Sequence, residues 1–262
     1  AVSKHGNGPI YSLGEAKFLV REEAQRMVSP LADSIPEPNL TLEPKRSIAI
    51  DRSFPGSIPP ENPLFKPADI KRIKDMGFDS VKFLLNPYAV MDGSNLINSD
   101  YIKKSVNTVI ENGLPCIVCI HPPRGFKGVY FSDKDEFRKL CLWYENIAAF
   151  LAENWNEKQI VFQMMTEPSG ASTDPDAWNY FNTLQHRIWA AIRRKLPQEY
   201  TIILGGDESG YLEALYFITP VEDPNVMYSF THHVPHVFAF HGSKMSKGRH
   251  YDQVSGLAWP AD

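Results

Sequence analysis

One glutamate stands where a buried strand is predicted to end. The apolar run Ile160–Phe162, continued by Met164 and Met165, is typical of a strand covered on both faces. Glu167 closes this run, and Pro168, which disfavours helical backbone in the residue before it, follows. In alternating β/α barrels the carboxyl ends of the strands carry the chemistry. Glu167 is therefore a candidate general acid or base, with a solvated loop glutamate as the alternative.

Histidines are the other titratable side chains at predicted strand ends. His121 directly follows the apolar run Cys116–Ile120, so it is either a ligand-contacting histidine or a core histidine satisfied by the backbone. His232, His233 and His236 are close in sequence, yet neighbours on one strand end do not converge on a metal without turns. No carboxylate partner is evident beside them, and we predict no metal site.

Composition limits the classes of function. A chain of 262 residues with 43% hydrophobic residues and a net charge of -4 is long enough for one large domain and offers no basic face for nucleic acid. No apolar run approaches the roughly 20 residues that span a bilayer. The chain begins at Ala1, as expected for a processed, secreted or periplasmic protein or for a trimmed chain.

The three cysteines are predicted to be buried thiols. Cys116 and Cys119 are three positions apart in one predicted strand, so their side chains point to opposite faces. Cys141 falls on a predicted helix. This placement disfavours a disulfide between Cys116 and Cys119.

Strands and helices are predicted to alternate after an N-terminal arm. The arm, residues 1–46, is rich in proline and polar residues, and we do not assign it to the core. The predicted strands are 47–51, 80–84, 116–120, 160–165, 201–204 and 226–230, and the predicted helices are 67–76, 100–112, 135–155, 176–196 and 211–217. No glycine-rich phosphate turn follows the first strand, which argues against a doubly wound sheet. This pattern predicts a TIM-type (β/α) barrel over residues 47–262.

The predicted barrel is short of two strands. Only the residues after Phe230 remain once six strands are counted, and they cannot hold two more strand–helix pairs. Bare strand edges are a liability in a parallel sheet. We therefore expect the chain to be incomplete at its C-terminus or to be completed by a second polypeptide.

The elements and their ends resemble the cellulase-like glycoside hydrolases of family 5, which belong to a large clan of retaining (β/α)8 enzymes. The similarity covers roughly residues 47–260. It is carried by Asp69–Lys82, Asn98–His121, Thr166–Glu167–Pro168, Val226–Gly242 and Leu257–Pro260. The resemblance implies that Glu167 is the acid/base in hydrolysis of O-glycosidic bonds of a β-linked polysaccharide or oligosaccharide, with water and no cofactor.

Several positions depart from the family pattern. Lys82 replaces an arginine and loses its planar fork, whereas Thr166 replaces an asparagine and keeps one short hydrogen-bonding group. Thr231 and His233 stand where the family has histidine and tyrosine, unless a one-residue slip brings in His232. The resemblance implies substrate contacts at His121, Thr166, Lys82, Thr231, His233 and Trp259. Tyr88, Phe126, Tyr130 and Trp259 are candidates for stacking on sugar rings, with ordinary packing as the alternative.

The second carboxylate of a retaining mechanism is missing from the pattern. Retention needs a nucleophile about 5 Å from the acid, and the resemblance implies a glutamate on the seventh strand, but no glutamate follows Glu222. Glu208 is the nearest substitute, and helix capping is its stronger interpretation. We favour a hydrolase. A decayed barrel that binds carbohydrate without cutting it remains the alternative, and a barrel of unrelated chemistry is a third possibility.

Overall fold

The computed structural model describes residues 37–50, 63, 65–123, 125–167, 175–206, 214–215, 218–231, 239, 244–245 and 249–250. For 175–180, 244–245 and 249–250 only the backbone is described. The chain divides into two compact units, Ala1–Phe230 and Thr231–Asp262. The second unit contains a two-stranded antiparallel pair, β9 (Lys244–Met245) and β10 (Arg249–His250).

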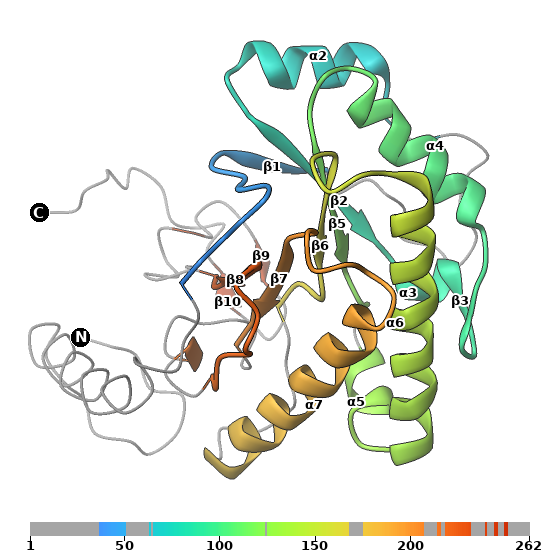
Figure 1. Ribbon diagram of the computed structural model, residues 1–262, viewed down its shortest axis with the longest axis vertical. Helices are drawn as coiled ribbons and strands as arrows, with labels where there is room; N and C mark the ends of the chain where they lie inside the picture. The colour runs from blue at the N-terminus through green and yellow to red at the C-terminus, as the bar shows by residue number, and fades with distance from the viewer. Residues whose placement is uncertain are drawn as a thin grey trace, which may run out of the picture. The chain divides into compact units, whose positions relative to one another are not determined.

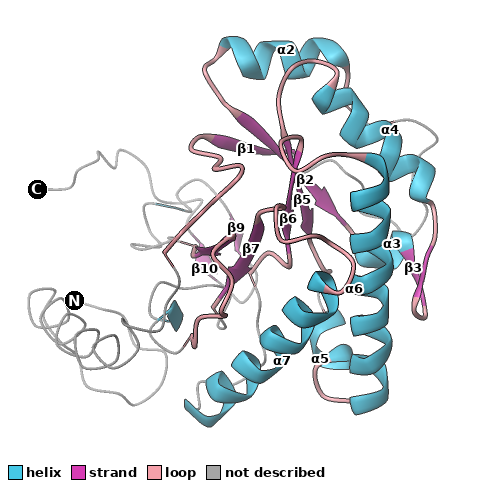
Figure 2. Ribbon diagram, in the orientation of Figure 1, coloured by secondary structure: helices cyan, strands magenta, loops and turns pink. Residues whose placement is uncertain are grey.

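Six parallel strands form the sheet of the first unit (Figures 1 and 2). They are β1 (Ser47–Ile50), β2 (Ser80–Leu85), β5 (Cys116–Ile120), β6 (Ile160–Gln163), β7 (Ile202–Gly205) and β8 (Val226–Ser229). Their order is β1-β2-β5-β6-β7-β8, and each neighbouring pair is parallel. Each strand lies beside the next one in the chain, as in a (β/α) barrel, whereas a doubly wound sheet reverses its order. The predicted strands and their parallel pairing are confirmed.

Helices follow the strands, as the apolar periodicity predicts. They are α2 (Pro67–Asp75), α4 (Ser99–Ile110), α6 (Lys134–Asn154) and α7 (Pro175–Arg193). Helix α6 starts after Asp133, whose carboxylate accepts hydrogen bonds from the backbone N–H groups of Asp135 and Glu136 at 2.8 and 2.9 Å. It buries one face, including Leu140 and Leu151, against the sheet. Among the helices of the described ranges, none is both long and apolar enough to cross a bilayer.

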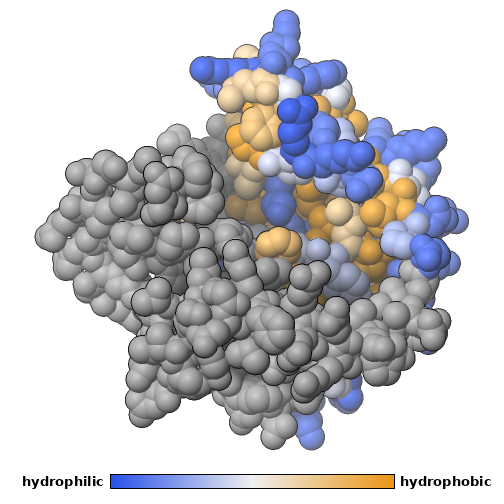
Figure 3. All heavy atoms as spheres, turned by 90° about the vertical axis from the view of Figure 1, so that its left-hand side faces the viewer, coloured by the Kyte–Doolittle hydropathy of each residue, from blue (hydrophilic) through white to orange (hydrophobic). Residues whose placement is uncertain are grey.

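The sheet carries different apolar clusters on its two faces. Cys116 and Val118 belong to the large cluster that includes buried residues of the helices, whereas Ile117 belongs to a small cluster with Val161 and Ile203. This alternation follows from the two-residue repeat of a strand. Seen from the side away from α4 and α6, the described surface shows apolar patches separated by hydrophilic side chains, with hydrophilic residues along its upper and right margins (Figure 3).

The last part of the N-terminal arm lies against the amino ends of β7 and β8. Asn39 N–H donates to the Pro224 carbonyl at 2.8 Å, and Leu42 N–H donates to Thr201 Oγ1 at 3.3 Å. Leu42 also packs against the small cluster around Ile117. Contrary to the expectation that the arm stays outside the core, this residue contributes to the interior of the barrel.

An ion pair with little exposure links the end of α7 to the start of β8. Arg193 Nε lies 2.6 Å from Asp223 Oδ2, and the two side chains are 11% and 2% exposed. Trp189 Nε1 donates to the same carboxylate oxygen at 3.0 Å, and Arg193 Nη2 donates to the Tyr200 carbonyl at 2.9 Å. Both charges are thus hydrogen-bonded, as buried charges must be.

Short elements lie in the segments that follow β2 and β5. They are α3 (Pro87–Val90), β3 (Met91–Asp92), β4 (Asn95–Leu96) and α5 (Phe126–Tyr130). Tyr88, Phe126 and Tyr130, predicted to lie in loops, are in α3 and α5. Elements this short have no sequence periodicity that could predict them. Helix α3 is capped by Asn86, whose side-chain oxygen accepts the Tyr88 N–H at 3.1 Å. The predicted helix 211–217 lies mostly outside the described residues. Its two described residues, Ala214 and Leu215, have 3₁₀-helical backbone.

Candidate active site

Glu167 lies at the carboxyl end of the sheet. Strand-like hydrogen bonds continue beyond β6, since Met164 N–H donates to the Ile203 carbonyl at 2.9 Å and Thr166 N–H donates to the Ile120 carbonyl at 2.8 Å. The next residue, Glu167, is exposed and has a φ of 42°. The left-handed region costs a non-glycine residue about 1–2 kcal/mol. Such conformations persist where the surroundings impose them, and they cluster at active sites.

His121 and Thr166 form a pair beside Glu167. His121 follows β5, and its backbone N–H donates to the Leu85 carbonyl at 2.9 Å. Its Nδ1 lies 2.7 Å from Thr166 Oγ1. A hydroxyl both donates and accepts, so this bond forms with either tautomer of the ring. Two of the predicted substrate-contacting residues thus meet next to the candidate acid.

Lys127 holds the backbone of Glu167. It lies on α5, and its Nζ donates to the Glu167 carbonyl oxygen. Helix α5 follows Gly125, whose φ of 92° suits a glycine at this tight turn. Sequence reasoning missed this contact, and no local signal could reveal it because the two residues are 40 positions apart.

Lys82 is half-buried on the inner face of the sheet. It is the third residue of β2, between Val81 and Phe83, which belong to the large cluster on the other face. The resemblance implies a position at the end of the strand, but Lys82 is roughly 10 Å short of Leu85 at 3.3 Å per residue. Burial raises the pKa of the Cys119 thiol to about 12, against the opposing effect of the nearby Lys82 ammonium. In the sheet register Lys82 pairs with Ile117 of β5, and both residues face the same side of the sheet.

Gln163 is a buried polar residue below Glu167 on β6. Its side-chain Nε2 lies 3.4 Å from both the Met165 carbonyl and Ser229 Oγ. Its Oε1 is buried and has no hydrogen-bond partner among the described residues. Sequence reasoning did not single it out, although a glutamine inside an apolar run was a visible signal.

The structure does not test the remaining predicted contacts. Thr231 is half-buried and begins the second unit. His233 and Trp259, together with His232, His236 and Glu208, lie outside the described residues. Within the residues the structure does describe, no group of three or more histidine, cysteine, aspartate or glutamate side chains could hold a metal ion.

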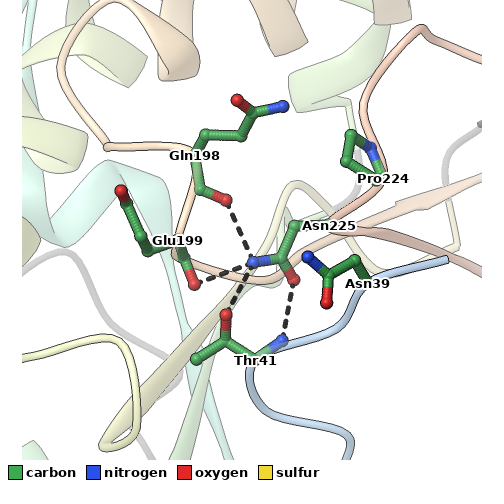
Figure 4. Close-up of a pocket in the computed structure, with 6 residues that line it drawn as sticks. All are labelled: Asn39, Thr41, Gln198, Glu199, Pro224 and Asn225. Atoms are coloured by element: carbon green, nitrogen blue, oxygen red, sulfur yellow. Dashed lines mark hydrogen bonds between the residues drawn. The ribbon is translucent and has the colours of Figure 1, made fainter.

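A pocket of about 250 Å³ lies at the other end of the strands (Figure 4). It is lined by Asn39, Thr41, Gln198, Glu199, Pro224 and Asn225. The Asn225 amide donates to Thr41 Oγ1 and to the carbonyls of Gln198 and Glu199, at 3.1, 3.0 and 2.8 Å. Its Oδ1 accepts from Thr201 Oγ1 at 2.7 Å. Because these residues precede β7 and β8, the pocket is at the amino end, where barrels place stability and not chemistry.

Comparison with known proteins places this geometry in a family. The sequence pattern of the cellulase family, glycosyl hydrolase family 5, matches residues 58–254. Cellodextrinase A of Ruminococcus flavefaciens is 27% identical over 189 residues, which cover 68% of this chain and 54% of the relative. The chain therefore spans about half the length of this curated relative.

Solved structures show the same fold. The cellulose synthase subunit Z of Clostridioides difficile has a TM-score of 0.67 at 23% identity, covering 84% of this chain and 71% of that chain. Endoglucanase Cel5A of Thermotoga maritima has a TM-score of 0.65 at 20% identity, covering 78% and 65%, and has been solved with cellobiose and with mannotriose. These likenesses establish the (β/α) barrel. Because the family pattern matches most of the chain, this protein belongs to the cellulase family, glycosyl hydrolase family 5.

Proposed function

We propose that this protein hydrolyses O-glycosidic bonds of a β-linked glycan, with Glu167 as the acid/base. The observation that carries the proposal is the exposed Glu167 side chain at the carboxyl end of β6, on a backbone fixed by Lys127. Membership of the cellulase family supports this chemistry. The relatives named as cellodextrinase and endoglucanase make β-glucans the first substrates to test, and the mannotriose complex adds β-mannans.

In this mechanism Glu167 handles the proton in both steps. It first protonates the leaving-group oxygen, and it then accepts a proton from the water that releases the sugar. His121 positions Thr166, the residue before Glu167, through their hydrogen bond, and Lys82 supplies a cation on β2. The family resemblance favours the retaining course, in which a second carboxylate attacks the anomeric carbon.

The described residues after β7 offer no carboxylate for that attack. Glu222 and Asp223 both precede β8 and so lie at its amino end, away from Glu167. Asp223 is also held by Arg193. The nucleophile must therefore come from outside these residues, and covalent trapping is the way to find it.

The leaving-group dependence of Glu167 variants tests the acid role. With the purified chain and aryl β-cellobiosides, Glu167→Ala is expected to lose about 100- to 10,000-fold in kcat/KM on a poor leaving group. Its kcat/KM should fall much less on dinitrophenyl cellobioside, because the dinitrophenolate leaving group departs without a proton. Azide should then restore turnover and yield β-cellobiosyl azide. Glu222→Gln, which removes an exposed acid at the opposite end, is the matched control. Equal losses on both leaving groups would contradict the assignment.

Trapping with an activated 2-deoxy-2-fluoro cellobioside tests the retaining course. The intact mass should rise by one fluorosugar, and peptide mapping should locate the labelled carboxylate. If cello-oligosaccharides bind in calorimetry while no substrate is cleaved and no label is taken up, the non-hydrolytic carbohydrate-binding barrel replaces the hydrolase.

A further inference from the structure

Two tyrosines near the candidate acid contact the same buried aromatic ring. Tyr88, on α3 after β2, is 41% exposed, and Tyr130, at the end of α5 after β5, is half-buried. Each contacts Phe126, which is fully buried, with ring centroids 5.3 Å away for Tyr88 and 4.4 Å away for Tyr130. Phe126 and Tyr130 are four residues apart on α5 and so lie on one side of it. The buried ring therefore holds both tyrosines in place.

This aromatic cluster is at the same end of the sheet as Glu167. Helix α5 carries Phe126 and, in the next position, Lys127, whose Nζ donates to the Glu167 carbonyl. Both α3 and α5 follow the carboxyl ends of their strands, where barrels bind their substrates. The aromatic cluster and the candidate acid are thus joined through one short helix.

Polar groups border the two rings. Burial raises the pKa of Tyr130, and the neighbouring Glu136 carboxylate and Tyr88 hydroxyl raise it further. Glu136 also pairs with Lys139, with 2.6 Å between Oε1 and Nζ. A hydroxyl, a carboxylate and an ammonium group are therefore neighbours of the Tyr130 ring. Such a small apolar surface within a charged rim suits a single sugar ring better than a protein partner, whose interfaces bury about 800 Å² per side.

We propose that Tyr88 and Tyr130 form a binding surface for a sugar ring of the glycan, away from the bond that is cleaved. This inference rests on the proposed function, because it takes a β-linked glycan as the ligand. The C–H groups on the face of a pyranose ring pack against the electron-rich face of an aromatic ring. The ring hydroxyls, which point outward, reach the tyrosine hydroxyls and the Glu136–Lys139 pair.

Binding without cleavage tests the surface. In the Glu167→Gln protein, titration calorimetry with cellohexaose and with cellobiose should show tighter binding of the longer sugar. Replacing Tyr88 and Tyr130 together by alanine is expected to weaken the binding of cellohexaose about ten-fold, as for loss of one stacked ring. It should also remove most of the preference for cellohexaose over cellobiose. Tyr88→Phe with Tyr130→Phe, which keeps the rings, should retain most of the affinity.

The control is Met76→Ala, which removes another exposed apolar side chain, 65% exposed, at the end of α2. Thermal melts confirm that each variant is folded. Unchanged cellohexaose affinity in the folded double alanine variant overturns the binding surface, even if the protein hydrolyses aryl cellobiosides. Tyrosine-dependent binding by a protein that cleaves nothing supports the surface and contradicts only the hydrolase.

Discussion

The imidazole of His121 and the hydroxyl of Thr166 meet across the neighbouring strands β5 and β6, with 2.7 Å between Nδ1 and Oγ1. Thr166 directly precedes Glu167, whose backbone is in the left-handed region. The hydrogen bond between His121 and Thr166 therefore restrains the residue that precedes Glu167.

Removing the Thr166 hydroxyl should lower turnover and leave the protein folded. Thr166→Val keeps the shape of the side chain and loses the bond to His121, so we expect kcat on cello-oligosaccharides to fall about ten-fold, as for one hydrogen bond of about 1.4 kcal/mol. Thr166→Ser should restore most of it. A double-mutant cycle with His121→Ala measures the coupling, and additive effects would contradict the pairing.

Loss of the Lys127 ammonium should disturb the Glu167 backbone. Lys127→Met keeps the length of the side chain but cannot donate to the Glu167 carbonyl, so we expect a lower kcat with little change in KM. Lys127→Arg keeps a donor and should recover activity. Steady-state kinetics on aryl cellobiosides separate the two parameters, and an effect on KM alone would show that Lys127 contacts substrate instead.

The Arg193–Asp223 pair should matter more than its exposed neighbour. Asp223→Ala leaves the little-exposed Arg193 without its partner, and it should reduce the free energy of unfolding by about 3–5 kcal/mol. Glu145→Ala breaks the more exposed Arg194–Glu145 pair and should cost about 1 kcal/mol or less. Urea unfolding followed by circular dichroism compares the two, and similar midpoints would contradict the argument.

Native cysteines should resist alkylation. Burial raises the pKa of the Cys116 and Cys119 thiols to about 12 and that of Cys141 to about 11. A raised thiol pKa lowers the thiolate fraction at pH 8, to about one in ten thousand for a pKa of 12. Iodoacetamide should leave the native mass unchanged and add three groups in urea. Rapid labelling of the folded protein would show that these thiols are accessible.

Sequence periodicity was enough for the repeating elements of the barrel and for the position of its candidate acid. Apolar runs and amphipathic stripes predict long elements because burial acts on every turn, and a strand end predicts the edge on which Glu167 and His121 both lie. The contact of Lys127 with Glu167 could not be predicted, since it depends on how the segment after β5 meets the end of β6. Lys82 lies in the middle of β2, as the predicted strand 80–84 already placed it, and its contact with substrate stays a prediction.

The hydrogen bonds at the amino end of the barrel have a consequence for the rate of folding. Thr41 and Asn225, which bond to each other there, are 184 positions apart. Such a contact forms only after most of the chain has been brought together, and contacts of long sequence separation slow folding. We expect docking of residues 39–42 to be the latest and slowest refolding phase, visible as late protection of the Leu42 amide in pulsed hydrogen exchange.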